Sequence, residues 1–224
     1  MMKYQDSFAQ LRQHTNVLEI NMDNVITEMR LRQGRTTKGL DDFLSKLQER
    51  YPQNACALPK LREIILNSRT PEIGFDRLTV GVGGISTTTK CIVNSDVISF
   101  EFRLVLYMIL HEVCHQMQYT KHGEQIAYKI WTDKIPMEAA IDELLKIENT
   151  ADRWAIMATK GIFRSCGWKE PMIQPAYKNA PRRMIARLIG DMRTAAKQKR
   201  FVNINQVNEY LYNTVRSVTS PKFN

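Results

Sequence analysis

Two histidines four residues apart, with a glutamate beside the first, are the residues of this chain best suited to chemistry. They lie in the segment MILHEVCHQM as His111, Glu112 and His115. On a helix, a spacing of four puts both imidazoles on one face, where they can reach a common metal ion. Glu112 is rotated by about 100° from His111, so its carboxylate can take a proton from a water on the metal without being a ligand itself. The motif predicts a catalytic zinc site with two histidine ligands and Glu112 as the base.

A catalytic zinc needs a third protein ligand and keeps its fourth place for water. Glu148 is the preferred candidate, because it interrupts the apolar stripe of a predicted helix over residues 136–160, and a carboxylate in such a stripe needs a compensating charge. Asp152 follows one turn later, where it can accept the outer N–H of a ligand histidine. His122, in the segment TKHGEQ, is the alternative third ligand.

The order HEVCH and then ENTAD resembles the gluzincin pattern, HExxH with a distal ExxxD. The stretch ENTADRWA is also similar to the ExxAxxFA segment of the ImmA/IrrE-like peptidases, with Trp154 in place of Phe. This resemblance covers roughly residues 76–160. It implies a small intracellular zinc peptidase in which Glu148 is the third ligand and Asp152 orients a histidine. It further implies that the strand before the zinc helix, KCIVN at residues 90–94, is the sheet edge that pairs with an extended substrate.

A second resemblance is to the SprT-like peptidases, whose HExxH motif is followed by a His-Gly pair. His122 and Gly123 fit that wording, and the resemblance implies action on DNA-bound proteins. Many zinc peptidases also use a Tyr or His to stabilise the oxyanion. Tyr119 and Tyr177 are the candidates for that role.

The remaining pattern predicts an α+β fold that is mostly helical, with a short sheet just before the central HExxH helix. We expect an N-terminal helical region over residues 1–70, a zincin-like core over 71–160 and a basic helical region over 161–224 packed on that core. The first region should contain one long amphipathic helix over 4–33, which packs on the same chain or forms a dimer seam, and shorter helices around 40–51 and 59–68. Two short strands are expected in LTVGV (78–82) and KCIVN. Further helices are expected near 123–134, 136–160, 181–199 and 203–218.

Positive charge is concentrated in the last third of the chain. Residues 160–224 carry 13 Lys/Arg against three acids, whereas the chain as a whole has a net charge of +9. A predicted amphipathic helix there has a basic face that a polyanion such as nucleic acid could contact. The candidate contacts are Arg182, Arg183, Arg187, Lys197 and Arg200.

Composition points to a cytoplasmic protein. The four cysteines show no CxxC pairing, which suits reduced thiols. The N-terminus lacks a signal-peptide layout and no apolar run is long enough to span a bilayer, so no membrane partner is expected. Two functions follow: a zinc metallopeptidase acting on a specific protein or peptide, or a nucleic-acid-associated protein with a structural or His122-containing zinc site. The oligomeric state is left open by the sequence.

Overall fold

The structure, a computed structural model, describes residues 37–68, 70–79, 82–176 and 181–217. The helix predicted over 4–33 lies outside them. In chain order the elements are α3 (Leu40–Arg50), the 3-10 helix η1 (Pro52–Ala57), α4 (Leu58–Asn67), β1 (Ile73–Asp76), β2 (Gly84–Ser86), β3 (Cys91–Asn94), the 3-10 helix η2 (Ser95–Ser99), α5 (Phe102–Gln118), α6 (Lys121–Trp131), α7 (Met137–Ser165), α8 (Arg182–Lys199) and α9 (Ile204–Ser217). The predicted class, mostly helical α+β with a small sheet before the HExxH helix, is confirmed.

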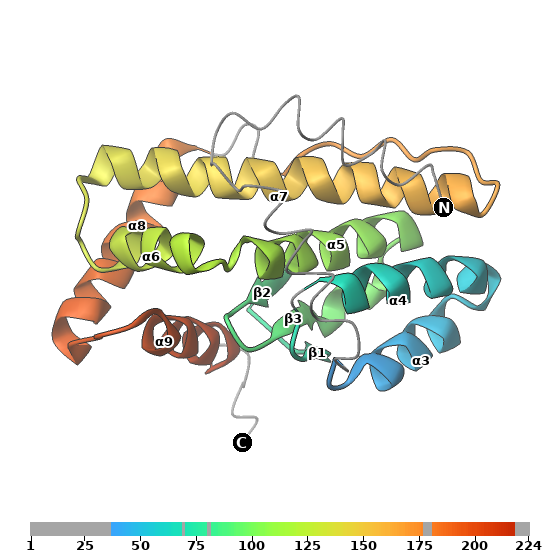
Figure 1. The fold of residues 1–224 in the computed structure, drawn as a ribbon, viewed down its shortest axis with the longest axis horizontal. Coiled ribbons are helices and arrows are strands. Elements are labelled where there is room, and N and C mark those ends of the chain that lie inside the picture. Colours follow the sequence, from blue (N-terminus) through green and yellow to red (C-terminus); the bar gives the residue numbers. More distant parts are fainter. Residues whose placement is uncertain (1–36, 69, 80–81, 177–180, 218–224) are drawn as a thin grey trace, which may run out of the picture.

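The HExxH helix, α5, is the central element of the main core. Thirteen of its 17 residues are buried, so apolar side chains leave it in nearly every direction, as expected for a helix surrounded by other elements. Figure 1 shows the long helix α7 lying along α5 and α6, with the sheet on the opposite side of α5. Helices α3 and α4 lie to the right of the sheet in this view. This packing places the motif between α7 and the sheet.

Within the described residues, the sheet has three strands in the order β1-β3-β2. β1 pairs with β3 in parallel, and β2 pairs with β3 in an antiparallel register. The alternation of side chains in β3 divides the core: Cys91 and Val93 join the main cluster with α5, whereas Ile92 contacts a cluster on the opposite face that includes Tyr212 of α9. The sheet is therefore covered on both faces.

The prediction of a strand in LTVGV is wrong for the residues of this segment that the structure describes: Leu78, Thr79 and Val82 lie in no strand. The first strand, β1, begins earlier, at Ile73, and a second strand, β2, begins at Gly84, the second glycine of the Gly83-Gly84 pair. Leu78 is fully buried, but its N–H donates to the side chain of Asn94, and Thr79 donates to the backbone carbonyl of Val215 on α9. A side chain and a helix carbonyl thus satisfy the N–H groups of Leu78 and Thr79 in place of a strand ladder.

The assignment of KCIVN to a sheet edge is also wrong. This segment forms β3, which lies between β1 and β2. Its three consecutive apolar residues are buried on alternate faces, a pattern typical of a central strand that has cover on both sides. The edge nearest α5 is β2.

A tight turn separates α5 from α6. Thr120 caps α6 by accepting a hydrogen bond from the N–H of Gly123, and a Cβ on Gly123 would collide with the carbonyl oxygen of Gln118. Helix α6 starts at Lys121, two residues earlier than the sequence suggested. His122 is therefore in the first turn of a second helix.

The C-terminal helices pack on the rest of the described chain. Helix α8 contacts α6 and α7, and α9 contacts α6. On α9, the Tyr212 hydroxyl donates to Asp76 at the end of β1, and the Lys90 ammonium lies 3.7 Å from the centre of the Tyr212 ring. Among the described residues, no helix combines the length and the apolar character that crossing a bilayer requires.

The packing of α8 can be tested by stability. Ile189 is fully buried against α6 and α7 in a cluster with Ile130 and Ile141, whereas its neighbour Leu188 is 44% exposed. We expect Ile189→Ala to lower the free energy of unfolding by about 2–5 kcal/mol, and Leu188→Ala to lower it by no more than about 0.5 kcal/mol. Urea unfolding measures both; equal losses would contradict the orientation of α8.

Candidate metal centre

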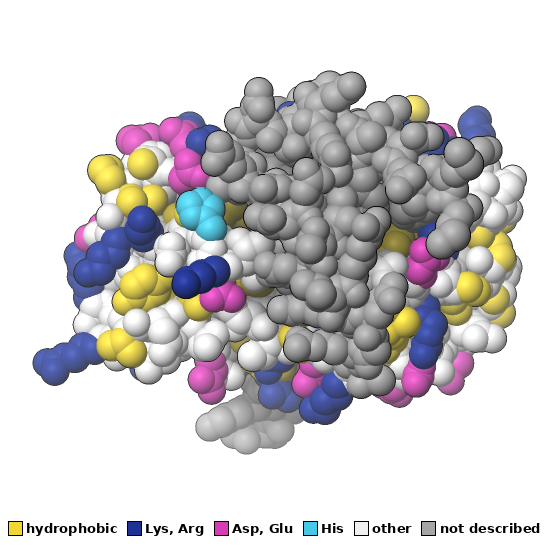
Figure 2. All heavy atoms as spheres, in the orientation of Figure 1, with side chains coloured by type: hydrophobic (Ala, Val, Ile, Leu, Met, Phe, Trp, Pro, Cys, Tyr) yellow, Lys and Arg dark blue, Asp and Glu magenta, His cyan; other side chains and the backbone are white. Residues whose placement is uncertain are grey.

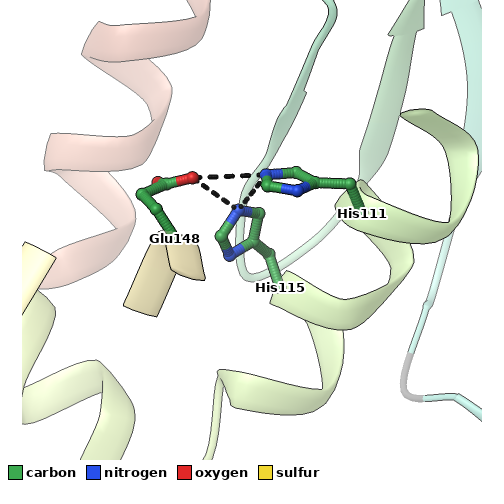
Figure 3. Close-up of side chains that lie close together, drawn as sticks. All are labelled: His111, His115 and Glu148. Atoms are coloured by element: carbon green, nitrogen blue, oxygen red, sulfur yellow. Dashed lines mark hydrogen bonds and ion pairs between the residues drawn. The ribbon is translucent and has the colours of Figure 1, made fainter. Parts of the chain in front are cut away.

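Three side chains from two helices converge on one point. His111 and His115 extend from α5 and Glu148 from α7, as Figure 3 shows. The two Nε2 atoms are 3.0 Å apart, and Glu148 Oε2 lies 3.2 Å from that of His111 and 3.4 Å from that of His115. Three atoms that can each present a lone pair need a positive species between them, either protons or a metal cation. The group could hold a metal ion.

The outer nitrogen of His111 is held by a buried carboxylate. Nδ1 lies 3.0 Å from Oδ1 of Asp152, one turn after Glu148 on α7, and the side chain of Asp152 is fully buried. The Tyr107 hydroxyl, on the turn of α5 before His111, donates to the same carboxylate oxygen. An Nδ1–H hydrogen bond to Asp152 leaves the Nε2 lone pair of His111 directed at the site.

Opposite charges dominate the electrostatics of the three converging residues. Burial by itself would lower the pKa of His111, but the hydrogen bonds with Asp152 and Glu148 outweigh it and raise that pKa to about 10. Burial would raise the pKa of Glu148, but the charge of His115 and the hydrogen bonds with both histidines lower it to about 2. The site therefore stabilises a carboxylate at Glu148 and favours positive charge beside it.

Glu112 lies on the sheet side of the same helix and is buried. Burial raises its pKa, against the lowering effect of the charges on His115 and His111. Its side chain passes so close to β2 that a Cβ on Gly84 would stand 2.5 Å from its Cγ. Ser86, two residues on in β2, donates from Oγ to the backbone carbonyl of Glu112 at 2.6 Å. Strand β2 thus fixes both the backbone and the side chain of Glu112.

The other residues that the sequence suggested for the site, His122 and Tyr119, are not part of the converging group. His122 is exposed on α6 and does not belong to the converging set. Tyr119, just after α5, donates from its hydroxyl to the carbonyl oxygen of Ser86 at 3.0 Å, which ties the end of α5 to β2. Tyr177 lies outside the described residues.

The five basic residues proposed as polyanion contacts are all exposed, but three of them are within ion-pair distance of acids. Arg182 binds Glu138 and Asp142 at 2.7 Å, Lys197 lies 3.0 Å from Asp133, and Arg187 lies 4.0 Å from Asp191. In Figure 2 basic, acidic and apolar side chains are interspersed on the face that is shown. These ion pairs offset part of the positive charge that the sequence concentrates in this region.

Sequence reasoning missed several residues around the site. Gln118 contacts the outer nitrogen of His115, and its spacing of three from that histidine on one helix was an available signal. Tyr107 stands four residues before His111 and had the same kind of signal. Gly84 and Ser86 had none, because their role depends on how β2 packs against α5.

No protein-family model matches the chain, and no curated protein and no solved structure matches it at a significant level.

Metal binding can be tested one side chain at a time. We expect the purified protein to retain a divalent metal after gel filtration, and His111→Ala, His115→Ala and Glu148→Ala each to lose it, because two ligands do not hold a catalytic ion. His122→Ala is the matched control and should keep the wild-type stoichiometry, measured by plasma mass spectrometry. Loss of metal in His122→Ala with retention in Glu148→Ala would reverse the assignment of the third ligand.

The contact between Gly84 and Glu112 predicts an energetic coupling. Gly84→Ala should lower the free energy of unfolding by about 1–3 kcal/mol, since the added methyl overlaps the Glu112 side chain. Much of this loss should disappear in a Glu112→Ala background, as measured by urea unfolding of the double-mutant cycle. Gly161→Ala is the control, because its Cβ meets no atom within 4 Å; in the interior of α7 it should stabilise by about 0.5–1 kcal/mol. Additive effects at Gly84 and Glu112 would contradict the contact.

Proposed function

We propose that the chain is a zinc-dependent metallopeptidase that uses Glu112 as its proton-transfer group. The observation that carries this proposal is the convergence of His111 Nε2, His115 Nε2 and Glu148 Oε2 within 3.4 Å of one another. Tetrahedral zinc with bonds of about 2.0–2.2 Å sets its ligand atoms about 3.3–3.6 Å apart. The side-chain distances of 3.0 to 3.4 Å suit such an ion with little rearrangement.

The choice of donors favours a catalytic site. Two imidazoles and one carboxylate are a set found in catalytic zinc centres, whereas structural zinc centres fill all four places with protein ligands. Within the described parts of the chain the converging group has three members, so a place remains for water. A zinc ion bound there would polarise a scissile carbonyl and make water a stronger acid.

Glu112 is suited to move the protons. Its carboxyl is next to the ligand pair, and burial raises its pKa, which brings a carboxylic acid closer to the range where it both accepts and returns a proton near neutrality. It would take the proton from the attacking water and pass it to the amine of the leaving fragment. A zinc ion held by His111 and His115 would place positive charge beside this carboxyl, which would limit the rise in its pKa and keep it able to ionise.

Strand β2 offers a place for an extended peptide. On either side of β2, the backbone N–H of Thr87 donates to the carbonyl of Lys90, and the N–H of Asn94 donates to the carbonyl of Gly83. Because hydrogen-bonded and non-hydrogen-bonded pairs alternate in an antiparallel ladder, the N–H and C=O groups of Gly84 and Ser86 point away from β3. The carbonyl of Ser86 is the acceptor for Tyr119. The backbone of Gly84 lies beside Glu112. A peptide that paired with this edge would place its own carbonyl groups near the proposed metal ligands.

Replacing Glu112 separates binding from chemistry. We expect Glu112→Gln to keep wild-type zinc stoichiometry and to reduce the rate of peptide cleavage by roughly 10²-fold or more, since the amide cannot accept the proton. Cleavage is measured on a library of unstructured peptides with products identified by mass spectrometry, and His122→Ala is the control that should cleave normally. Cleavage that survives in Glu112→Gln would refute the peptidase proposal, as would wild-type protein that binds zinc but cleaves none of the library.

A further inference from the structure

Gln118, the last residue of α5, contacts both helices that build the site. Its side-chain Nε2 donates to the backbone carbonyl of Ile147 on α7 at 3.0 Å, and its Oε1 lies 2.7 Å from Nδ1 of His115. The residue is 9% exposed. A buried amide with both ends engaged has a defined orientation.

These two contacts determine which nitrogen of His115 carries hydrogen. A backbone carbonyl only accepts, so the amide NH₂ group must face Ile147 and the amide oxygen must face His115. An amide oxygen also only accepts, so Nδ1 of His115 is the donor. The lone pair of His115 is then on Nε2, which points at His111 and Glu148.

The side chain of Gln118 also connects His115 with the backbone next to Glu148. Ile147 directly precedes Glu148, so Gln118 joins the ring of the second ligand to the backbone beside the third. His111 is likewise held from α7, but by the carboxylate of Asp152. A neutral amide at position 118 orients its imidazole without adding another negative charge next to Glu112, Glu148 and Asp152.

We propose that Gln118 is a positioning residue that fixes the tautomer and direction of His115 and holds the end of α5 in register with Glu148. The inference rests on the proposed zinc centre and adds to it a residue that touches neither metal nor substrate. Outer-shell partners of this kind typically contribute roughly 10–100-fold to metal affinity. The neighbouring Gln116 provides a comparison: it is also buried on α5, but its Nε2 donates to the carbonyls of Thr87 and Lys90 in the β2–β3 turn.

The test measures the zinc dissociation constant by competition with a chromophoric chelator, using the full chain. Gln118→Met keeps the length of the side chain and removes both hydrogen bonds, and it should raise the dissociation constant by roughly 10–100-fold. Gln118→Glu keeps an acceptor for Nδ1–H but loses the donor to Ile147, so it should bind zinc more tightly than Gln118→Met. Gln116→Met should leave the dissociation constant unchanged although it too removes two buried hydrogen bonds.

A second measurement does not depend on any variant. In zinc-loaded wild-type protein, long-range ¹H–¹⁵N spectra should show His115 protonated at Nδ1 and bound through Nε2. Coordination of His115 through Nδ1 would overturn the inference, and so would wild-type affinity in Gln118→Met or an equal loss in Gln116→Met. Failure of the wild-type protein to bind zinc at all would overturn the proposed metal centre and this inference with it, and is distinguished by the wild-type titration alone.

Discussion

Helices α5 and α7 pack along each other, and this contact decides where the polar residues of the site meet. Both helices bury apolar side chains in the main core, which sets their separation and rotation with the precision of a close-packed interior. Into that interface they place two imidazoles from α5 and two carboxylates, Glu148 and Asp152, from α7. Isolated, each of these groups would be costly to bury. Placed together they compensate one another, and a cation between them would complete the compensation.

Two different kinds of polar residue hold the outer nitrogens of His111 and His115. On one side the fully buried Asp152 receives hydrogen bonds from Tyr107 and His111. On the other, the amide of Gln118 connects His115 to the backbone of α7. Each leaves an Nε2 lone pair directed inward, because each outer nitrogen is engaged by an acceptor. A metal site gains affinity when its ligands are held in the binding orientation before the ion arrives.

The sheet helps to position Glu112, because strand β2 packs closely against α5. Gly84 lets Glu112 lie against β2, and Ser86 binds the backbone carbonyl of Glu112. Helix α9 covers the opposite face through Tyr212, which also bonds to Asp76. The short strands are therefore held by side chains and helices from distant parts of the chain, which compensates for their length of three or four residues. This support keeps β2 at a fixed distance from α5.

The mostly helical class, the course of the HExxH helix and the position of His111 and His115 on one face could be predicted from the amino-acid sequence, because these features depend on helical periodicity and on spacings of three and four. The sequence also singled out Glu148, since an acidic residue in an apolar stripe requires a partner, and Asp152, since it follows Glu148 by one helical turn. Other features of the fold and of the site depend on tertiary contacts. Three features depend on contacts between segments far apart in the chain. They are the central place of β3 in the sheet, the hydrogen bonds of Leu78 and Thr79 to Asn94 and α9 in place of a strand ladder, and the contact of Gln118 with Ile147. Local pattern specifies which face of an element is apolar, but the partner of that face is chosen only when the whole chain packs.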